Sequence, residues 1–396
     1  MNILEGGLRN VSGFTFSAIE CGIRYDNRLD MALLYSEKPC YASAVFTRNR
    51  LFAAPVKLCR ERIANDIHAI LINATNANAC TGDEGYNNAL QLTREIASVL
   101  GVPENSVLMA STGIIGVQLP VGKMRSSIPS LVNTLSADNG PRLARAIMTT
   151  DTYPKEYAVS FETSSGTYTI GGVAKGSGMI APDMATLLSF IITDFPLEKK
   201  ALDEVFRSCI DRTLNAITID GDSSTNDTAI ILSPVTNDPV TNETDIEHFS
   251  QALFHLLESL SVMLIRDGEG ATKCVTIRVA GAASPDDAKK AAKTIAESLL
   301  VKTALFGEDP NWGRIACAAG YSGADMHEDT LTIEIENVPL LVKGEPVEYP
   351  IDDIRTILAR ESFVVTINLG AGDNHFSFLT TDLSYEYVKI NAEYST

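Results

Sequence analysis

Two different spacings of hydrophobic residues alternate along this chain, and together they predict a fold that contains both helices and sheets. Hydrophobic residues recur every three or four positions over 202–214 and again over 246–264, which is the spacing of one buried helix face. Residues 275–279 alternate between apolar and polar, as in a half-buried strand, and 187–192 are apolar on both faces. No regular βαβ period connects these segments. The pattern therefore predicts an α+β fold in which helices cover sheets.

Local signals set the expected ends of several elements. Pro196 is predicted to open the helix that contains 202–214, because proline is common in the first helical turn. Ser284-Pro-Asp-Asp287 has the N-cap, the proline and the acidic residue of a helix start, and that helix is predicted to run to about Leu300. Further strands are predicted at 107–110, 168–170, 331–335 and 363–369.

The loop before the apolar run 187–192 carries the strongest chemical signal. It reads Lys175-Gly-Ser-Gly-Met-Ile-Ala-Pro-Asp-Met-Ala185-Thr186, so that one threonine stands at the mouth of a rigid strand. If the chain is cut between Ala185 and Thr186, the threonine gains a free α-amine, and one residue then supplies both nucleophile and base. Such an amine has a pKa of roughly 7.7–8.0, which suits proton transfer near neutrality. An ordinary turn before a buried strand is the alternative, whereas a phosphate loop is excluded because Lys175 precedes its glycine.

Three other polar segments are candidates for a site. Ser111-Thr-Gly113 follows a short strand, where small residues let backbone N–H groups form an oxyanion hole, although the same triplet is also a common turn. Glu269 stands between two glycines, which would leave it free to face a ligand amine. The alternative is that these glycines only end a helix and form a turn. Residues 220–227 resemble a calcium loop, but Thr225 and Ile231 occupy the positions that need glycine and glutamate. Two interpretations of that segment remain: a hydrogen-bonded loop beside an active site, or a plain polar turn.

Composition and charge argue against several function classes. The 396 residues carry a formal net charge of −18 without a basic stripe, which argues against nucleic-acid binding. The seven cysteines are scattered and never spaced as CxxC, and the five histidines are isolated, so we expect no disulfide framework, metal or organic cofactor. The N-terminus lacks a signal-peptide pattern, and no apolar run approaches the roughly 20 residues of a membrane span. We therefore expect a cytoplasmic protein that binds neither membranes nor nucleic acids.

Nine motifs, in order along the chain, carry a resemblance to a known family. They are Ser111-Thr-Gly-Ile-Ile-Gly116, Met148-Thr-Thr-Asp-Thr152, Lys175-Gly-Ser-Gly-Met179, Met184-Ala-Thr186, Asp220-Gly-Asp222, Ser224-Thr-Asn-Asp227, Asp267-Gly-Glu-Gly-Ala-Thr-Lys273, Asp309-Pro-Asn-Trp-Gly-Arg314 and the C-terminal run Asp382–Thr396. Through them the chain resembles, over nearly its whole length, the glutamate N-acetyltransferase (ornithine acetyltransferase) family of arginine biosynthesis. Two departures stand out: Asn73-Ala-Thr-Asn76 where the family commonly has Asn-Ser-Gly-Asn, and Asp183 where asparagine is common.

The resemblance implies a fold, a maturation step and an assembly. The implied fold is a four-layer αββα sandwich with a smaller C-terminal α/β part. The chain is expected to cut itself between Ala185 and Thr186 into an α chain (1–185) and a β chain (186–396) that share one core. Two α and two β chains are expected to assemble.

The implied reaction moves the acetyl group of N2-acetyl-L-ornithine to L-glutamate through an acetyl ester on Thr186. Thr112 and Gly113 are expected to donate backbone N–H groups to the oxyanion. Substrate contacts are expected at Thr152, Lys175, Thr186, Glu269, Asn391 and Thr396. From charge, Lys175 suits the substrate carboxylate, and Glu269 suits the side-chain ammonium of ornithine. Acetyl-CoA as a second donor, hydrolysis by a related aminopeptidase or amidase, and an uncleaved non-catalytic member stay open.

Overall fold

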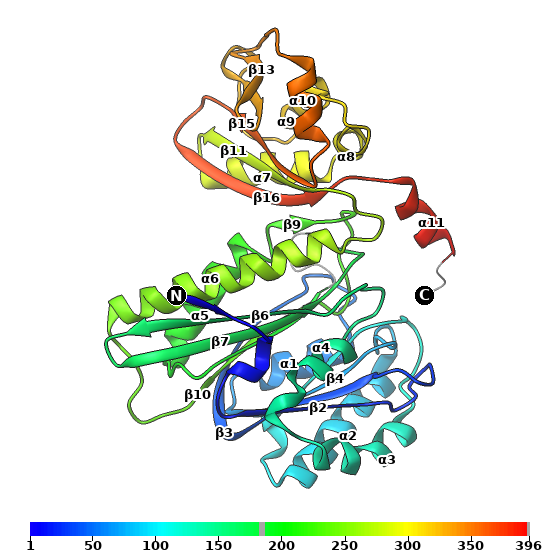
Figure 1. The fold of residues 1–396 in the computed structure, drawn as a ribbon. Coiled ribbons are helices and arrows are strands. Elements are labelled where there is room, and N and C mark those ends of the chain that lie inside the picture. The colour runs from blue at the N-terminus through cyan, green and yellow to red at the C-terminus, as the bar shows by residue number, and fades with distance from the viewer. Residues whose placement is uncertain (182–186, 394–396) are drawn as a thin grey trace.

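Two β-sheets with helices packed against them make up the structure (Figure 1). The computed structural model describes residues 1–181 and 187–393. Within this part of the chain, the first sheet has nine strands: β1 (Asn2–Leu4), β2 (Phe14–Ile19), β3 (Met31–Phe46), β4 (Ile67–Asn73), β5 (Val107–Ser111), β6 (Lys155–Thr163), β7 (Gly166–Lys175), β8 (Leu188–Thr193) and β10 (Thr228–Pro234). Seven described strands form the second sheet: β9 (Ile217–Thr218), β11 (Cys274–Ala282), β12 (Thr332–Ile335), β13 (Val338–Val342), β14 (Glu345–Pro346), β15 (Ser362–Asn368) and β16 (Asn374–Thr381). The described α-helices are α1 (Ala54–Arg62), α2 (Gly82–Leu100), α3 (Val121–Asn133), α4 (Gly140–Ala146), α5 (Lys199–Arg212), α6 (Glu243–Arg266), α7 (Pro285–Glu297), α8 (Leu299–Phe306), α9 (Trp312–Gly320), α10 (Ile351–Leu358) and α11 (Tyr385–Glu393).

The first sheet contributes both inner layers of a sandwich, and the long strand β3 passes through both. Successive side chains of a strand point to opposite faces, so the sheet contributes side chains to one inner core and two outer cores. Leu34 of β3 enters the inner core together with Ile72 of β4 and Phe190 of β8. Leu33 points outward, into the core beneath α2 and α3. The outer face of β7, β8 and β10 packs instead against α5 and α6, which completes and confirms the αββα order.

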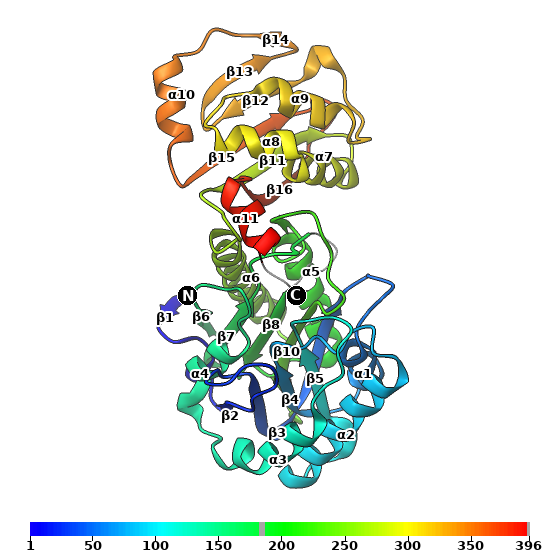
Figure 2. The same ribbon diagram turned by 90° about the vertical axis from the view of Figure 1, so that its right-hand side faces the viewer.

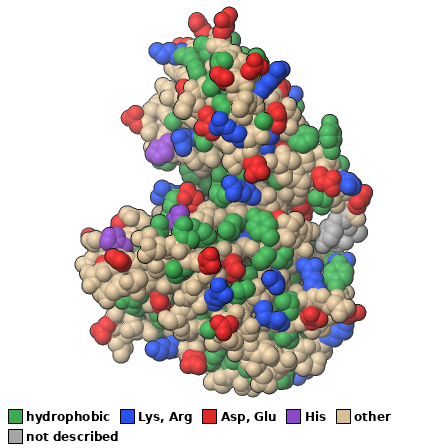
Figure 3. Space-filling model, in the orientation of Figure 1, with side chains coloured by type: hydrophobic (Ala, Val, Ile, Leu, Met, Phe, Trp, Pro, Cys, Tyr) green, Lys and Arg blue, Asp and Glu red, His purple; other side chains and the backbone are tan. Residues whose placement is uncertain are grey.

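The second sheet builds the smaller C-terminal part, which has a separate hydrophobic core. Strands β11 and β15 run parallel at its centre, and β16 lies antiparallel on the other side of β11. Helices α7, α8, α9 and α10 bury their apolar faces against this sheet. A groove of about 520 Å³, lined by α6, β11 and β16, separates the two parts, and a hollow is visible at the left of Figure 3. After β16 the chain returns toward the first sheet as α11 (Figure 2).

Most elements predicted from hydrophobic spacing are present, but two helix boundaries are wrong. The helix expected from Pro196 begins at Lys199 as α5, because Pro196 accepts a backbone hydrogen bond from Val240 and the segment pairs as an isolated β-bridge. The helix expected to reach Leu300 is interrupted at Ser298. This residue is extended, and its side chain accepts a hydrogen bond from the Val301 N–H, so it caps a new helix, α8.

The strand pairings bring several chain segments to one end of the first sheet. Lys175, the last residue of β7, pairs with Leu188 at the start of β8. Leu188 also pairs with Thr228, the first residue of the parallel strand β10. Ser111 ends β5 opposite the last residue of β4, Asn73. In the described residues, no helix is both long and apolar enough to span a bilayer.

Candidate active site

A cavity of about 130 Å³ lies where these strand ends meet the C-terminal end of α6 and helix α11. Five of the residues predicted from the sequence line it: Thr112, Gly113, Lys175, Glu269 and Asn391. These residues come from both halves of the sequence, on either side of residue 186. The fold therefore gathers, around one small hollow, most of the described residues that were predicted to contact a substrate.

The remaining predicted residues do not line this cavity or cannot be placed. Thr152 lies beside it, where its N–H and its hydroxyl both donate to Asp267. It lines an adjoining hollow that shares Glu269 with the main cavity. The predicted nucleophile and cleavage residues, Ala185 and Thr186, and the predicted contact Thr396 lie outside the described residues, as does Asp183, where the sequence departs from the family.

The Thr112–Gly113 turn has at most one free backbone N–H among the described residues, that of Gly113, whereas the sequence predicted two backbone donors. The N–H of Thr112 donates to the carbonyl of Asn73 at 3.0 Å, so only the hydroxyl of Thr112 is available to a ligand. Among the described residues, no group accepts the N–H of Gly113. Gly113 has a φ of 134°, and a Cβ there would lie 2.1 Å from the backbone carbon of Thr75. Glycine is therefore required at this position for conformational and steric reasons.

Lys175 places a buried ammonium group at the floor of the cavity. Its side chain is 2% exposed, and Nζ donates to the Thr112 hydroxyl at 3.3 Å. Burial lowers the pKa of Lys175, because desolvation disfavours the charged form, while the carboxylate of Asp151 opposes this effect. No described carboxylate forms a close ion pair with Lys175.

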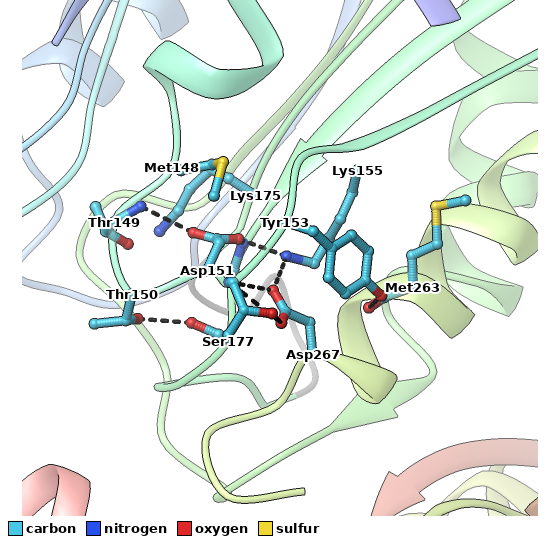
Figure 4. Close-up of polar contacts among 12 residues, drawn as sticks. Met148, Thr149, Thr150, Asp151, Tyr153, Lys155, Lys175, Ser177, Met263 and Asp267 are labelled. Atoms are coloured by element: carbon cyan, nitrogen blue, oxygen red, sulfur yellow. Dashed lines mark hydrogen bonds and ion pairs between the residues drawn. The ribbon is translucent and has the colours of Figure 1, made fainter. Parts of the chain in front are cut away.

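A buried group of opposite charges supports the cavity from behind (Figure 4). Lys155 of β6 donates to Asp151 at 2.7 Å and to Asp267 at 2.5 Å, and all three side chains are nearly inaccessible. Asp151 also accepts the N–H of Gly176 at 2.7 Å, which fixes the end of β7. Burial alone would raise the pKa of Asp151, but the cations of Lys175 and Lys155 outweigh burial and lower this pKa to about 2.

Glu269 and Asn391 form the opposite wall of the cavity. Glu269 Oε2 accepts a hydrogen bond from Asn391 Nδ2 at 2.9 Å, which joins the loop after α6 to α11. The N–H of Glu269 donates to the carbonyl of Ser177 at 2.7 Å. A Cβ on Gly178 would lie 2.5 Å from a carboxylate oxygen of Glu269, so glycine permits this close approach. A negative group thus faces the cavity in addition to the ammonium of Lys175.

The structure adds residues for which the sequence suggested no role. Asn226 lines the cavity, and its Nδ2 donates to the carbonyls of Ala77 at 2.6 Å and Ser111 at 2.8 Å. Thr149 and Thr150 line it as well. Asn226 lies within 220–227, which is therefore a hydrogen-bonded loop beside the cavity. The motif Ser224–Asp227 was a sequence signal for this loop. The role of Asn226 within it could not be predicted, because its partners lie more than a hundred positions away in the sequence.

The described residues of the cavity supply one lysine, one glutamate, several hydroxyl groups and the backbone N–H of Gly113. A small amino-acid ligand carries matching charges, since its carboxylate can face Lys175 and an ammonium group can face Glu269. Among residues 1–181 and 187–393, no three His, Cys, Asp or Glu side chains are grouped so that they could hold a metal ion.

Comparison with known proteins places these residues in a family context. The model of the ArgJ family matches residues 15–396. The arginine biosynthesis bifunctional protein ArgJ of Geobacter sulfurreducens is 46% identical over 392 residues, which cover 98% of this chain and all of that protein. The protein of the same name from Caldanaerobacter subterraneus is 42% identical over 404 residues and is covered completely, as is this chain. Among solved structures, an ArgJ protein from Bacillus halodurans is 37% identical, covering 52% of this chain and 98% of that chain with a TM-score of 0.49.

Proposed function

The chain belongs to the ArgJ family, and we propose that it transfers the acetyl group of N2-acetyl-L-ornithine to L-glutamate in arginine biosynthesis. The products are L-ornithine and N-acetyl-L-glutamate. One observation carries this proposal for the site: five residues predicted from the sequence, from Thr112 to Asn391, line a single cavity that contains groups of opposite charge. The relatives named above share the whole length of the chain, so the full reaction is proposed rather than part of it.

The proposed reaction begins after the chain is cut between Ala185 and Thr186. The Thr186 hydroxyl then attacks the acetyl carbonyl, and the new α-amine takes the proton. The Gly113 N–H and the Thr112 hydroxyl, which both line the cavity, are proposed to donate to the oxyanion, and one such donor is worth about 3–4 kcal/mol in the transition state. Ornithine leaves with a proton on its amine, and an acetyl ester remains on Thr186. The amine of glutamate attacks this ester and restores the hydroxyl.

We propose that the charged groups of the cavity bind the two amino acids in turn at one site. Lys175 is proposed to bind the α-carboxylate that ornithine and glutamate have in common. Glu269 is proposed to bind the side-chain ammonium of ornithine, with Asn391 holding the carboxylate in place. Thr152 is proposed to act at the edge of the site, since its hydroxyl is bound to Asp267. Thr396 is proposed to contact the substrate at the C-terminus.

Further parts of the proposal come from the family rather than from the cavity. The relatives are named bifunctional, so we propose that acetyl-CoA also donates the acetyl group to glutamate. No bound cofactor is proposed. The chains 1–185 and 186–396 are proposed to remain together, in an assembly of two copies of each. A cytoplasmic location is proposed for this enzyme.

Product analysis tests the proposed function against hydrolysis. The purified protein is incubated with acetylornithine, with and without glutamate, and acetate and N-acetylglutamate are quantified. Acetyl transfer predicts that N-acetylglutamate forms in step with ornithine when glutamate is present. Equal release of acetate in both conditions would identify an amidase instead, and no turnover of an uncut chain would identify a non-catalytic member.

A further inference from the structure

Three arginines line the groove between the two parts of the molecule, and none of them forms an ion pair with another described residue. Arg212 ends α5, Arg266 ends α6, and Arg278 lies in the central strand β11. Glu258 is the single acidic residue among the described residues that line the groove. The groove therefore gathers positive charge in a chain whose formal net charge is −18.

The strand pattern directs Arg278 into the groove rather than into the core. Successive side chains of a strand point to opposite faces, and the two chain neighbours of Arg278, Ile277 and Val279, lie in the core beneath α7. Arg278 itself lines the groove, and its cross-strand neighbours are the uncharged Thr366 of β15 and Ser377 of β16. Neither adjacent strand therefore places a carboxylate directly opposite this cation.

A smaller hollow of about 300 Å³ lies between this groove and the active-site cavity. The hollow shares Arg266 with the groove, and it shares Thr150 and Glu269 with the cavity. From Arg266 the groove extends along α6 to Glu258, over which the helix rises about 12 Å at about 1.5 Å per residue. The three spaces therefore adjoin in a row that is longer than an amino-acid substrate needs.

We infer that the groove binds the phosphate groups of acetyl-CoA and directs the acetyl end of that molecule to the cavity, a binding role that rests on the proposed function. Guanidinium groups match phosphate oxygens in charge and in hydrogen-bond geometry, so three of them suit a donor that carries its phosphates on a nucleotide. The guanidinium group of Arg212 lies 4.7 Å from the ring centroid of Phe254, and this cation–π contact helps to hold it at the groove. The amino-acid substrates carry no phosphate, so the groove serves the thioester donor alone.

The replacements Arg278→Gln and Arg212→Gln test this role, because each removes one cation and keeps a polar side chain. Arg355→Gln is the matched control, since Arg355 of α10 is exposed and its helix packs against the other face of the same sheet. Formation of N-acetylglutamate is measured with three acetyl donors: acetyl-CoA, acetylornithine and S-acetyl-N-acetylcysteamine, a short thioester without phosphates. Binding of coenzyme A and of inorganic phosphate is measured separately by isothermal titration calorimetry.

We expect KM for acetyl-CoA to rise roughly 10- to 100-fold in each groove variant, the range that one hydrogen bond to a charged group contributes to affinity. KM for acetylornithine and for the short thioester should stay unchanged, because neither donor carries a phosphate. Coenzyme A should bind the groove variants more weakly by a similar factor, and it should bind the wild type more tightly than inorganic phosphate does. Arg355→Gln should match the wild type with all three donors.

An unchanged KM for acetyl-CoA in both groove variants would overturn this binding role. If those variants change only the oligomeric state in size-exclusion chromatography, the groove is instead a contact between copies of this chain. Should Arg278→Gln not fold, Arg212→Gln, at the end of a helix, decides the question by itself. A wild type that transfers acetyl groups from acetylornithine but neither binds coenzyme A nor uses acetyl-CoA also overturns the role of the groove, whereas failure of the transfer from acetylornithine overturns the proposed function.

Discussion

Two buried lysines on neighbouring strands of the first sheet have opposite surroundings. Lys155 of β6 lies opposite Ala174, the residue before Lys175 in β7, and the two lysines are 0% and 2% exposed. Lys155 is enclosed by two carboxylates, whereas Lys175 donates to a threonine hydroxyl at the cavity and forms no close ion pair with the described residues. The comparison teaches that burial alone does not identify a functional lysine. A cation whose charge is already satisfied supports the fold, and a cation left unpaired at a cavity can bind a ligand.

The largest expected effect is the loss of stability in Lys155→Met, which tests whether Lys155 supports the fold. Removing Lys155 leaves Asp151 and Asp267 buried without their close cation, and such a loss costs about 3–5 kcal/mol. Urea unfolding measures the change. Lys199→Met is the control, because Lys199 pairs with Asp203 in a partly exposed bridge worth less than about 1 kcal/mol. Equal stability losses in both variants would refute the structural role of Lys155.

Lys175→Met is the complementary variant and should affect activity more than stability. We expect kcat/KM for acetylornithine to fall about 100-fold, or ~2.7 kcal/mol of transition-state stabilisation, when measured per cleaved enzyme. The free energy of unfolding should change less than in Lys155→Met, because Lys175 forms no close ion pair with any described residue. Steady-state kinetics combined with urea unfolding separates the two effects. A variant with normal kcat/KM but severe destabilisation would reverse the assignment of the two lysines.

Acid unfolding sharpens the comparison through Asp151, which faces both lysines. Its pKa is lowered to about 2 in the folded protein, so its contribution to stability is present above pH ~4 and is lost as pH falls toward 2. The shift corresponds to about 2 kcal/mol. In Asp151→Asn this part of the acid dependence should disappear. Superimposable stability curves for wild type and Asp151→Asn between pH 4 and 2 would show that Asp151 is not coupled to the lysines.

The smallest expected effect concerns the anionic side of the cavity. Asn391→Ala removes the hydrogen bond that orients Glu269, and we expect KM for acetylornithine to rise about five- to tenfold with little change in kcat, since such a bond is worth about 1 kcal/mol. Lys389→Ala, on the same helix but exposed, is the control. If both substitutions leave KM unchanged, α11 does not contribute to substrate binding.

The layered fold was predictable because its elements have strong and simple periodicities. Helices α5 and α6 and strands β8, β11 and β15 were expected from hydrophobic spacing and are present. The errors occurred where a distant partner decides the local conformation. Pro196 is held by Val240 rather than beginning a helix, and no local signal in the sequence reveals that pairing.

Site residues that belong to a chemical motif could be predicted from the sequence. Residues that form an ion pair with a distant part of the chain could not. Thr112, Lys175 and Glu269 stand in recognisable motifs, and the cavity brings them together. Lys155 stands in an ordinary strand, and only its contact with Asp267, 112 residues away, shows its importance. The hydrogen bond that occupies the Thr112 N–H was likewise hidden, because it depends on the position of Asn73.

The central claim is that acetyl transfer passes through a threonine at the start of a new chain. Intact mass spectrometry of the purified protein, incubated with acetylornithine in the absence of glutamate, tests this claim most directly. The account predicts two fragments, 1–185 and 186–396, and one additional acetyl group on Thr186 of the second fragment, which glutamate then removes. A single uncut chain that turns over acetylornithine, or an acetyl group on another residue, would contradict the account.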